Sequence, residues 1–229
     1  MKEDLRKRYT TLVGFLGKAL GPHFEVVLHE VDTPEKGIVA IANGHVSGRS
    51  VGAPLTNTAL RLLVEKEYEK TDCVINYDGV LGNGKPIRSS TFFIMDGEKP
   101  TGMLCINFDD SEFHEMAEHL MRLVHPDAFV ERHRPMPAPA LQAAFADVPE
   151  ETEHFQNDSG ALMEQLYRDA VKSLLLVPPF SGNDRALLIK RLQERGLFEL
   201  KGSVPFAIEK LGCSQASIYR YLRRAKENN

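Results

Sequence analysis

VINYDGVL (residues 74–81), IRSSTFFIM (87–95) and TGMLCINF (101–108) are the three runs that decide the fold of the N-terminal part of the chain. Each run is rich in β-branched and aromatic residues, which favour strands. Asn83-Gly84 lies between the first two runs and Asp96-Gly97 between the last two, and such pairs adopt the positive φ angles that tight hairpin turns require. The sequence therefore predicts three neighbouring antiparallel strands.

Two further strands are expected upstream of this meander. The runs EVVLHEV (25–31) and GIVAIAN (37–43) are separated by DTPEKG, a spacing that fits a hairpin. Turn-forming residues follow in GHVSGRSVGAP (44–54), and Pro54 is typical of the first turn of a helix. We expect this helix to cross over from the hairpin to the meander.

Helices are expected at both ends of this strand pattern. An apolar stripe at three- and four-residue spacing runs from Leu5 to Leu20 and indicates the first helix. Ser111 is expected to cap the last one, whose apolar face runs from Phe113 to Val124. The order helix, two strands, helical crossover, three strands, helix predicts an α+β domain, a five-stranded antiparallel sheet with its helices segregated to one side.

A linker is expected between this domain and the C-terminal part. Residues 131–159 contain four prolines and an acidic run without sustained periodicity, as is typical of interdomain linkers. A helical pattern follows until Pro178-Pro179. We accordingly divide the chain into an N-terminal domain at 1–130, a linker at 131–159, a connecting helix at 160–180 and a C-terminal domain at 181–229.

The C-terminal domain carries the sequence SVPFAIEKLGCSQASIYRYLRRAKE (203–227), which is typical of a helix-turn-helix. A short helix with Ala207, Ile208 and Leu211 inward breaks at Gly212, where a turn between two crossing helices favours a residue without a Cβ. Ser214 can cap the second helix. Upstream, NDRALLIKRLQERGLF predicts a supporting helix, capped at Asn183 or Asp184 and closed at Gly196, so that three helices form a small all-α module.

The second helix of this pair is expected to read DNA. The first residues of such a recognition helix meet base edges in the major groove, and the arginines that follow neutralise phosphates or read guanine. An ordinary helical hairpin with a solvated basic face is the alternative interpretation. The residues predicted to contact DNA are Ser214, Gln215, Ser217, Tyr219, Arg220, Arg223 and Arg224.

The charge of the chain is distributed unevenly. The formal net charge is −4 over 229 residues, but residues 183–229 hold ten Lys/Arg against five Asp/Glu and therefore carry +5. The rest of the chain carries −9. This asymmetry suits a chain of which only the C-terminal part meets phosphates.

The chain resembles the YheO-like regulators, a family that joins an N-terminal PAS-like domain to a C-terminal helix-turn-helix. The resemblance implies a PAS fold for the five-stranded domain, control of transcription, and a ligand-sensing or partner-sensing role for the N-terminal part. The chain is also similar to regulators of D-amino-acid, especially D-arginine, catabolism. The matching stretches are VVLHEVD (26–32), IANGHVSGR (41–49), INYDG (75–79), GKPIRSSTFFI (84–94), MLCINFD (103–109) and GLFELKGSVPFAIEKLGCSQASIYRYL (196–222).

Polar strand residues are the candidates for binding a ligand, because PAS-like domains use the cavity between sheet and helices. Arg49 and Arg88 can each hold a carboxylate with two hydrogen bonds, so the set suits a small polar or anionic ligand, such as an amino acid or a keto acid. Strand alternation alone does not tell which face is interior, and each residue can instead be satisfied by neighbouring backbone. The candidates are His29, Asn43, His45, Arg49, Asn76, Tyr77, Arg88, Ser90 and Asn107.

We therefore expect a homodimeric, ligand-responsive transcriptional regulator whose two recognition helices lie about one turn of DNA apart on a pseudo-palindromic operator. The expected dimer surface is the N-terminal helix or residues 160–176. Ligand is expected to favour one arrangement of the DNA-reading modules, whether the outcome is repression or activation. The alternative is a regulator whose PAS-like domain is only a dimerisation or protein-interaction platform.

An enzyme, a metal site and a cofactor are not expected. HEMAEH (114–119) has three residues between Glu and His where the zinc-protease motif has two, and its two histidines lie about 140° apart around a helix. Cys73, Cys105 and Cys213 form no CxxC and are expected to be reduced thiols. The sequence has no run of eighteen apolar residues that could cross a membrane, and its charged start lacks the features of a secretion signal. We therefore expect a cytoplasmic protein.

Overall fold

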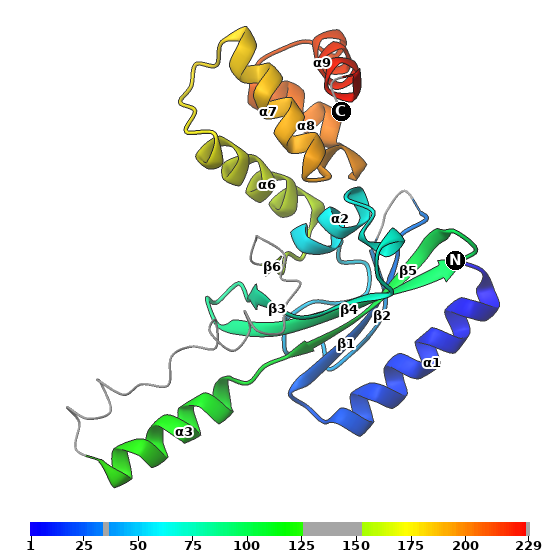
Figure 1. The fold of residues 1–229 in the computed structure, drawn as a ribbon, viewed down its shortest axis with the longest axis vertical. Helices are drawn as coiled ribbons and strands as arrows, with labels where there is room; N and C mark the ends of the chain where they lie inside the picture. Colours follow the sequence, from blue (N-terminus) through cyan, green and yellow to red (C-terminus); the bar gives the residue numbers. More distant parts are fainter. Residues whose placement is uncertain (34–36, 126–152, 228–229) are drawn as a thin grey trace.

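The computed structural model describes residues 1–33, 37–125 and 153–227 (Figure 1). Its centre is a six-stranded sheet with the order β2-β1-β5-β4-β3-β6. The sheet and the helices that flank it form one lobe, and the helices of the C-terminal part form the other. The two lobes meet at α2 (Figure 1). The strands are β1 (Phe24–Glu30), β2 (Gly37–Ala42), β3 (Cys73–Val80), β4 (Pro86–Asp96), β5 (Lys99–Phe108) and β6 (Glu153–His154).

The hairpin and the meander that the sequence predicts are both confirmed. Strands β1 and β2 pair antiparallel, as do β3, β4 and β5 in order. The turns depend on glycine at Gly84 (φ 84°) and Gly97 (φ 66°), as expected for tight connections. Pairing of β1 with β5, with Val27 opposite Cys105, joins the hairpin to the meander.

The sixth strand was not anticipated, because it falls within the expected linker at 131–159. Glu153 and His154 pair with Gly79 and Val80 of β3, and this pairing is parallel. The sheet is therefore six-stranded and mixed, where the sequence predicted five antiparallel strands. A two-residue strand is too short to show alternation, and its partner strand lies far away along the chain. Residues 131–152 of the expected linker lie outside the described ranges.

Helices cover both faces of the sheet, which corrects the expectation that they would lie on one side. Helix α1 (Glu3–Leu20) packs on β1 and β2, with Val13 against the cluster of Val26 and Leu28. Helix α2 (Asn57–Val64) covers the opposite face. Val26, Val27 and Leu28 are consecutive and have no exposed surface, so both faces of β1 are apolar and each needs a cover.

The two other helices of the N-terminal part begin near, but not at, their expected residues. Thr56 rather than Pro54 precedes α2, and its side chain accepts a hydrogen bond from the Ala59 N–H. Helix α3 (Ser111–Val124) begins at Ser111, with Asp110 at the N-cap position. It projects away from the sheet (Figure 1), so its apolar residues do not join the core.

The C-terminal lobe consists of α6 (Ser159–Ser173), α7 (Gly182–Glu194), the short turn η2 (Leu197–Glu199), α8 (Ser203–Leu211) and α9 (Gln215–Glu227). The expected cap of α7 at Asn183 or Asp184 is corrected to Ser181. Ser181 and Asp184 exchange hydrogen bonds as a capping box, so Asp184 takes part from the third helical position. Gly196 (φ 79°) follows α7, as expected for a closing glycine.

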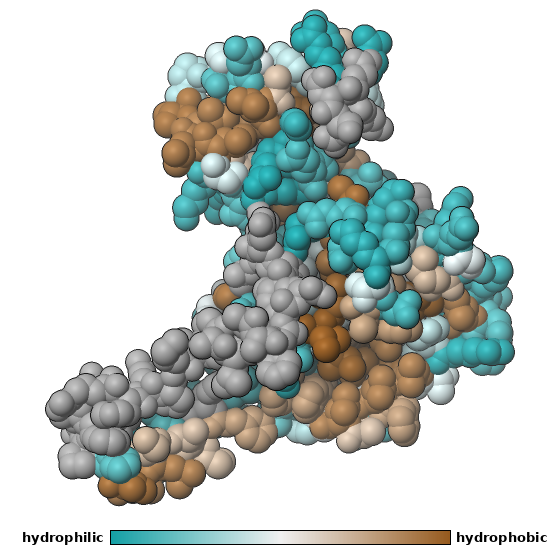
Figure 2. Space-filling model, viewed as in Figure 1, coloured by the Kyte–Doolittle hydropathy of each residue, from teal (hydrophilic) through white to brown (hydrophobic). Residues whose placement is uncertain are grey.

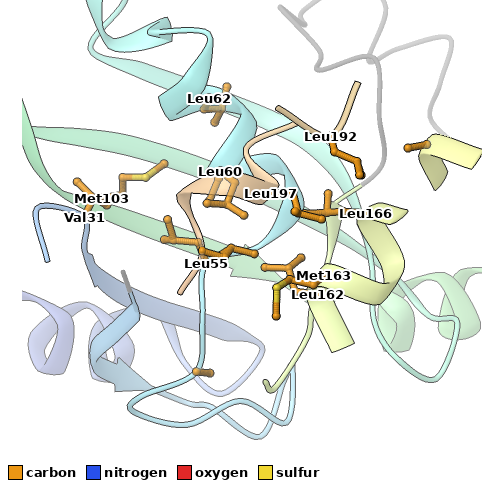
Figure 3. Packing of buried hydrophobic residues seen from close by; sticks show 14 of the residues in the cluster. Val31, Leu55, Leu60, Leu62, Met103, Leu162, Met163, Leu166, Leu192 and Leu197 are labelled. Carbon is orange, nitrogen blue, oxygen red and sulfur yellow. The ribbon is translucent and has the colours of Figure 1, made fainter. Parts of the chain in front are cut away.

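One apolar core runs through both lobes (Figure 3). Leu55 and Leu60 from the α2 segment lie beside Leu162 and Leu166 of α6, and Leu197 of η2 completes the junction. A Cβ at Gly196 would lie only 3.1 Å from the Val64 side chain, so backbone and helix are in close contact. None of the helices in the described part of the chain is long and apolar enough to span a membrane.

Candidate nucleic-acid interface and sensor interior

The turn between α8 and α9 is built from the residues that the sequence singled out. Gly212 has φ 57°, and its N–H donates to the Ile208 carbonyl at 3.0 Å, which ends α8. A side chain at this left-handed position would be strained. Ser214 then caps α9, because its Oγ accepts a hydrogen bond from the Ser217 N–H at 3.3 Å. The two helices are thus held at a fixed angle by local geometry.

Packing determines which face of α9 is exposed to solvent. Ile218 is fully buried against Ala207 and Leu211 of α8, which are themselves buried. Tyr221 and Leu222 pack against the same cluster from the side. The opposite face is consequently left to solvent.

The seven residues predicted to contact DNA lie along this outward face or at its start. Ser214, Gln215 and the three arginines are exposed, Ser217 is half-buried, and Tyr219 leaves 53% of its surface accessible. The Arg220 guanidinium lies over the Tyr221 ring, 5.5 Å from its centroid, which steadies a side chain at the middle of the helix. The arrangement presents hydroxyl, amide, phenol and guanidinium groups from a single helix.

Helix α6 packs against this helical pair. Lys210 of α8 forms an ion pair of 2.7 Å with Glu164 of α6 and lies over the rings of Tyr167 and Phe206. The hydrogen bond with Glu164 raises the pKa of Lys210 and lowers that of the carboxyl. Lys210 therefore serves the α6–α8 contact, although it contributes to the basic surplus of the C-terminal part.

A second group of polar residues lies inside the N-terminal domain, on the sheet face opposite α1. Strand register places Glu25, Asn107 and Ser89 in one row across β1, β5 and β4. The residues that line this interior come from five strands and the loop between β2 and α2, and we call them the sensor interior. They are Glu25, His29, Arg49, Thr56, Tyr77, Ser89, Thr91, Cys105, Asn107 and Glu153, all of which are buried.

Hydrogen bonds tie much of the sensor interior together. Glu25 accepts from the Asn107 amide at 2.8 Å and from the Ser47 hydroxyl at 2.5 Å. Thr56, the cap of α2, donates to Glu153 at 2.6 Å. Buried atoms without a hydrogen-bond partner among the described residues include Nδ1 of His29 and Nε of Arg49. Such atoms are rare in proteins and point to a site that accepts an additional polar group.

Burial dominates the ionisation of these groups. It raises the pKa of Glu25 and of Glu153, against the opposing effects of their hydrogen bonds and of the Arg49 charge. Burial and then the Arg49 charge lower the pKa of His29 well below its usual value. Burial also raises the pKa of Cys105 to about 12. The sensor interior thus holds two carboxyls and one guanidinium around a neutral imidazole and an inert thiol.

The structure divides the predicted ligand residues into two groups. His29, Arg49, Tyr77 and Asn107 come together in the sensor interior, where the Tyr77 hydroxyl bonds to Thr91 at 2.8 Å. The other five lie elsewhere. They are Asn43, His45, Asn76, Arg88 and Ser90.

Asn43 and His45 both contact backbone carbonyls near the end of α1. Asn43 donates to the carbonyls of Gly17, Gly21 and Phe24 and so ties the end of α1 to the sheet. His45 is exposed and contacts the Pro22 carbonyl.

Arg49 and Arg88, the two arginines predicted to bind a carboxylate, lie on opposite sides of the sheet. Arg88 is exposed on the other face of β4, where it stacks over Phe108 at 5.1 Å and bonds to Asn76. Ser90 accepts from the Asn76 N–H on that same face. Any anion in the sensor interior therefore meets Arg49 without Arg88.

The two buried carboxyls were missed at the level of sequence. Glu25 carried a usable signal, because it alternates with Val27 and His29 and so shares their face of the strand. Glu153 carried none, since its burial depends on β6, which is too short to detect. Ser47 and Thr56 are turn and cap residues whose contacts follow from these carboxyls.

A separate cleft of about 320 Å³ lies between the two lobes. Its walls are mostly apolar, and Lys66 and Glu199 stand at its rim. Its apolar lining comes from Val31, Leu60, Leu63, Val64, Tyr68 and Pro100. Within the ranges that the structure describes, no group of three or more His, Cys, Asp or Glu side chains is placed to hold a metal ion.

Comparison with known proteins matches both lobes. Residues 1–125 match the YheO-like PAS domain family, and residues 162–223, which include most of α6, match a helix-turn-helix domain family. YheO of Escherichia coli K12, an uncharacterized protein, is 25% identical over 229 residues, which cover 99% of this chain and 87% of YheO. An uncharacterized protein of Haemophilus influenzae is 24% identical, with coverage of 96% and 90%. The transcriptional regulator DauR of Pseudomonas aeruginosa is 23% identical, with coverage of 96% and 94%.

Proposed function

The chain belongs to the YheO-like PAS domain family, and from this premise we propose that it is a transcriptional regulator that binds operator DNA through α9 and senses a small polar ligand in its PAS-like domain. The family is one of regulators with a helix-turn-helix, not a class of enzymes. One observation carries the DNA-binding part of the proposal. It is the outward face of α9, which follows a glycine turn and offers side chains suited to base edges and phosphates.

Position along α9 separates the two kinds of DNA contact. Residues at the start of a recognition helix reach base edges, so we assign Gln215, Ser217 and Arg220 to base reading. Arg223 and Arg224 lie one turn later, where a helix leaves the groove, and we assign them to phosphates. Helix α6 belongs to the DNA-reading module in this proposal, because the Glu164–Lys210 ion pair holds α8 in place.

Two arginine variants test this assignment. Arg220→Ala should reduce affinity for the preferred operator by roughly 5- to 150-fold, equivalent to about 1–3 kcal/mol, and relax the base preference at one position. Arg223→Ala should weaken operator and random DNA alike and reduce the slope of affinity against salt by about one unit. The measurement is fluorescence anisotropy over a salt series, on sites selected from genomic fragments by the purified protein.

Lys172→Ala is the matched control, since Lys172 is an exposed cation of α6 away from α9. It should bind like the wild type. If Arg220→Ala and Arg223→Ala also bind both DNAs like the wild type, α9 does not read DNA and the proposal is wrong.

The sensor interior supports a small polar ligand. Nδ1 of His29 and Nε of Arg49 are buried without a partner among the described residues. A ligand oxygen can accept from Nε of Arg49, and Nδ1 of the neutral His29 can donate to a ligand oxygen or accept from a ligand ammonium group, according to its tautomer. Arg49 suits a carboxylate, whereas Glu25 and Glu153 suit an ammonium group. An amino acid complements all three charges, and a keto acid complements Arg49 alone.

Calorimetric titration with amino acids and keto acids tests the sensing role. Saturable heat is expected for at least one compound, and Arg49→Gln should weaken that affinity at least tenfold because it removes the charge facing the carboxylate. Arg88→Gln is the control, because Arg88 lies on the outer face of the sheet and should leave the affinity unchanged. A protein that binds no compound but still controls transcription would favour the alternative, a PAS-like domain that acts only as a platform for dimerisation or protein interaction.

Helix α2 offers a route from the sensor interior to the DNA-reading module. Its cap Thr56 donates to Glu153 inside the sensor, and its other end contacts the backbone at Gly196 after α7. A ligand that competes for Glu153 would therefore act directly on α2. It shifts DNA binding only if it binds the two arrangements of the lobes unequally.

We also propose a homodimer. One recognition helix makes few phosphate contacts, and a second copy on a pseudo-palindromic operator doubles them. Helix α6, one of the two dimer surfaces expected from the sequence, buries Leu162, Leu166 and Ala170 within its own chain. Helix α1 keeps Phe15 exposed on its outer side.

A further inference from the structure

The sensor interior is closed to solvent, so a ligand can enter it only if part of the chain moves. Glu25 and Ser89 have no exposed surface, and Tyr77 leaves only 1% of its surface accessible. Within the described residues, β6 is joined to the sheet through Glu153 and His154 alone, whereas β3 pairs with β4 from one end to the other. Displacement of β6 therefore disrupts fewer backbone hydrogen bonds than displacement of any other strand that lines the interior.

Glu153 fills an anion-binding position inside the sensor. Its Oε1 accepts a hydrogen bond from the Thr56 hydroxyl at 2.6 Å, and the Arg49 charge favours its ionised form. The hydroxyls of Ser89 and Tyr77 lie close to the same carboxyl. Hydroxyl groups and a guanidinium are the donors that a free carboxylate requires. The chain therefore places its own carboxylate where a ligand carboxylate would bind.

The fit of Glu153 in this position is incomplete. Its Oε2 is buried without a hydrogen-bond partner among the described residues, as is Nε of Arg49. Burial raises the pKa of Glu153, and the charge of Glu25 adds to the rise. Both oxygens of Glu25, in contrast, accept hydrogen bonds, one from Asn107 and the other from Ser47. Glu153 is therefore the more weakly held of the two buried carboxyls.

The segment that carries Glu153 leads directly into the DNA-reading module. Figure 2 shows that the molecule narrows between the two lobes, and residues 155–158 join β6 to α6 across this narrow part (Figure 1). The side chain of Asp158 caps α6. Glu164 of the same helix forms the ion pair with Lys210 of α8. A displacement of Glu153 therefore acts directly on the start of α6.

We propose that the Glu153 carboxylate competes with the ligand carboxylate for the position beside Arg49, and that ligand binding displaces Glu153 together with β6. The inference rests on the proposed function, because it requires a ligand that carries a carboxylate. It narrows that function in one respect, since Glu25 then meets the ammonium group of an amino acid and Glu153 is an internal competitor. Displacement also withdraws Glu153 from Thr56 at the cap of α2. The closed and displaced arrangements thus bind the ligand unequally, as control of DNA binding requires.

The first experiment removes the internal carboxylate and supplies a free one. Glu153→Ala takes away the atoms beyond Cβ, which correspond to acetate. Acetate should therefore raise the melting temperature of this variant saturably, by about 3–6 °C at a tenfold excess over its dissociation constant, whereas acetamide should not. Adding Arg49→Gln to Glu153→Ala should abolish the effect. The wild type and Glu98→Ala, which changes an exposed turn residue, should respond to acetate as they do to sodium chloride.

The second experiment holds β6 on the sheet and leaves Glu153 unchanged, so it does not depend on how well Glu153→Ala folds. His154 lies opposite Val80 in the register, and cysteines at these two positions can form a disulfide across the strands. The background is Cys73→Ser with Cys213→Ser, which removes the two native thiols that are not buried. The chain with His154→Cys and Val80→Cys should bind pyruvate or alanine at least tenfold more weakly when oxidised than when reduced, as measured by calorimetry. The chain with His154→Cys alone is the control, and its affinity should not depend on oxidation.

The outcomes separate failure of this inference from failure of the proposed function. A disulfide-linked chain that binds pyruvate or alanine as tightly as its reduced form overturns the displacement of β6, and the proposed sensing stands. An acetate response of Glu153→Ala no larger than that of the wild type overturns the competition, with the same consequence. A wild type that binds no amino acid or keto acid overturns this inference and the proposed sensing together, and leaves DNA binding through α9 to the arginine variants.

Discussion

At the scale of single residues, the sensor interior brings ionisable groups together away from water. Arg49 lies near both Glu25 and Glu153, and its charge favours the ionised form of each carboxyl. Burial has a larger effect than the Arg49 charge, so the pKa of each carboxyl is raised. A polar interior of this kind favours the folded state less than an apolar one would, which is consistent with a role in binding rather than in stability.

The raised pKa of Glu153 predicts a pH-dependent effect of Glu153→Gln. A carboxyl with a raised pKa contributes its full stability below the unfolded value of 4.5, and the contribution is lost as pH rises through the folded pKa. Glutamine cannot ionise, and it can still accept the hydrogen bond from Thr56. The variant should therefore gain stability relative to the wild type as pH rises above 4.5, measured as the difference in urea midpoint at a series of pH values.

One variant guards this prediction. Glu98→Gln, at an exposed turn position, should show no such trend. His29 acts in the opposite sense, because its lowered pKa means that the unfolded chain binds a proton more readily as pH falls below 6.5, but it does so in both proteins, so the difference between Glu153→Gln and the wild type reports on Glu153. A Glu153→Gln variant that loses stability relative to the wild type as pH rises would contradict the raised pKa.

Residue chemistry alone could not separate the buried candidate ligand residues from the exposed ones. Arg49 and Arg88 are equally suited to a carboxylate, yet one is buried beside Glu153 and the other stacks on Phe108 outside. Alternation gives two faces but not the identity of the inner one, because β1 is apolar on both. The exposed face of α9 was easier to predict, because the positions of Gly212 and Ile218 fix the inner side of that helix.

At the scale of elements, local signals made the meander and the helical pair predictable. Gly84, Gly97 and Gly212 each occupy a left-handed position next to the element that the sequence pattern predicts. Strand β6 and the start of α2 are instead joined by the hydrogen bond from Thr56 to Glu153. Such a contact joins segments far apart in the chain and leaves no periodic pattern in either of them.

The glycine that follows α7 predicts a difference in stability between two glycine variants. Gly196 and Gly202 have φ of 79° and 86°, so alanine at either position should cost about 1 kcal/mol in backbone strain. A Cβ at Gly196 would also lie 3.1 Å from Val64 of α2, whereas nothing lies within 4 Å at Gly202. Gly196→Ala should therefore destabilise the protein more than Gly202→Ala does, as measured by urea unfolding.

The excess destabilisation of Gly196→Ala measures the contact between α2 and the DNA-reading module. It should be accompanied by faster hydrogen exchange in α2, which Gly202→Ala should leave unchanged. Equal unfolding free energies for the two variants would mean that the α2 contact does not constrain the backbone after α7.

At the scale of the whole molecule, one core joins the sheet to the helices that carry α9. Leu60 of α2, Leu166 of α6 and Leu197 of η2 lie together at the junction (Figure 3). The family matches divide the chain into two parts, but Leu60, Leu166 and Leu197 are all buried where these parts pack together. Ligand state and DNA-reading state can therefore be coupled by shared packing, without a flexible tether between them.

This shared core predicts that the two lobes unfold as one unit. Leu197 has no exposed surface, and Leu197→Ala should cost about 2–5 kcal/mol through lost burial and the cavity left at the junction. Hydrogen exchange should then show an equal loss of protection in β4 and in α8. Ile87→Ala, in a separate small cluster with Leu81 and Phe155, provides the reciprocal test and should lower protection in α8 as well. If Leu197→Ala loosens only α8, or Ile87→Ala only the strands, the lobes unfold separately and a signal from the sensor interior needs a route other than the common core.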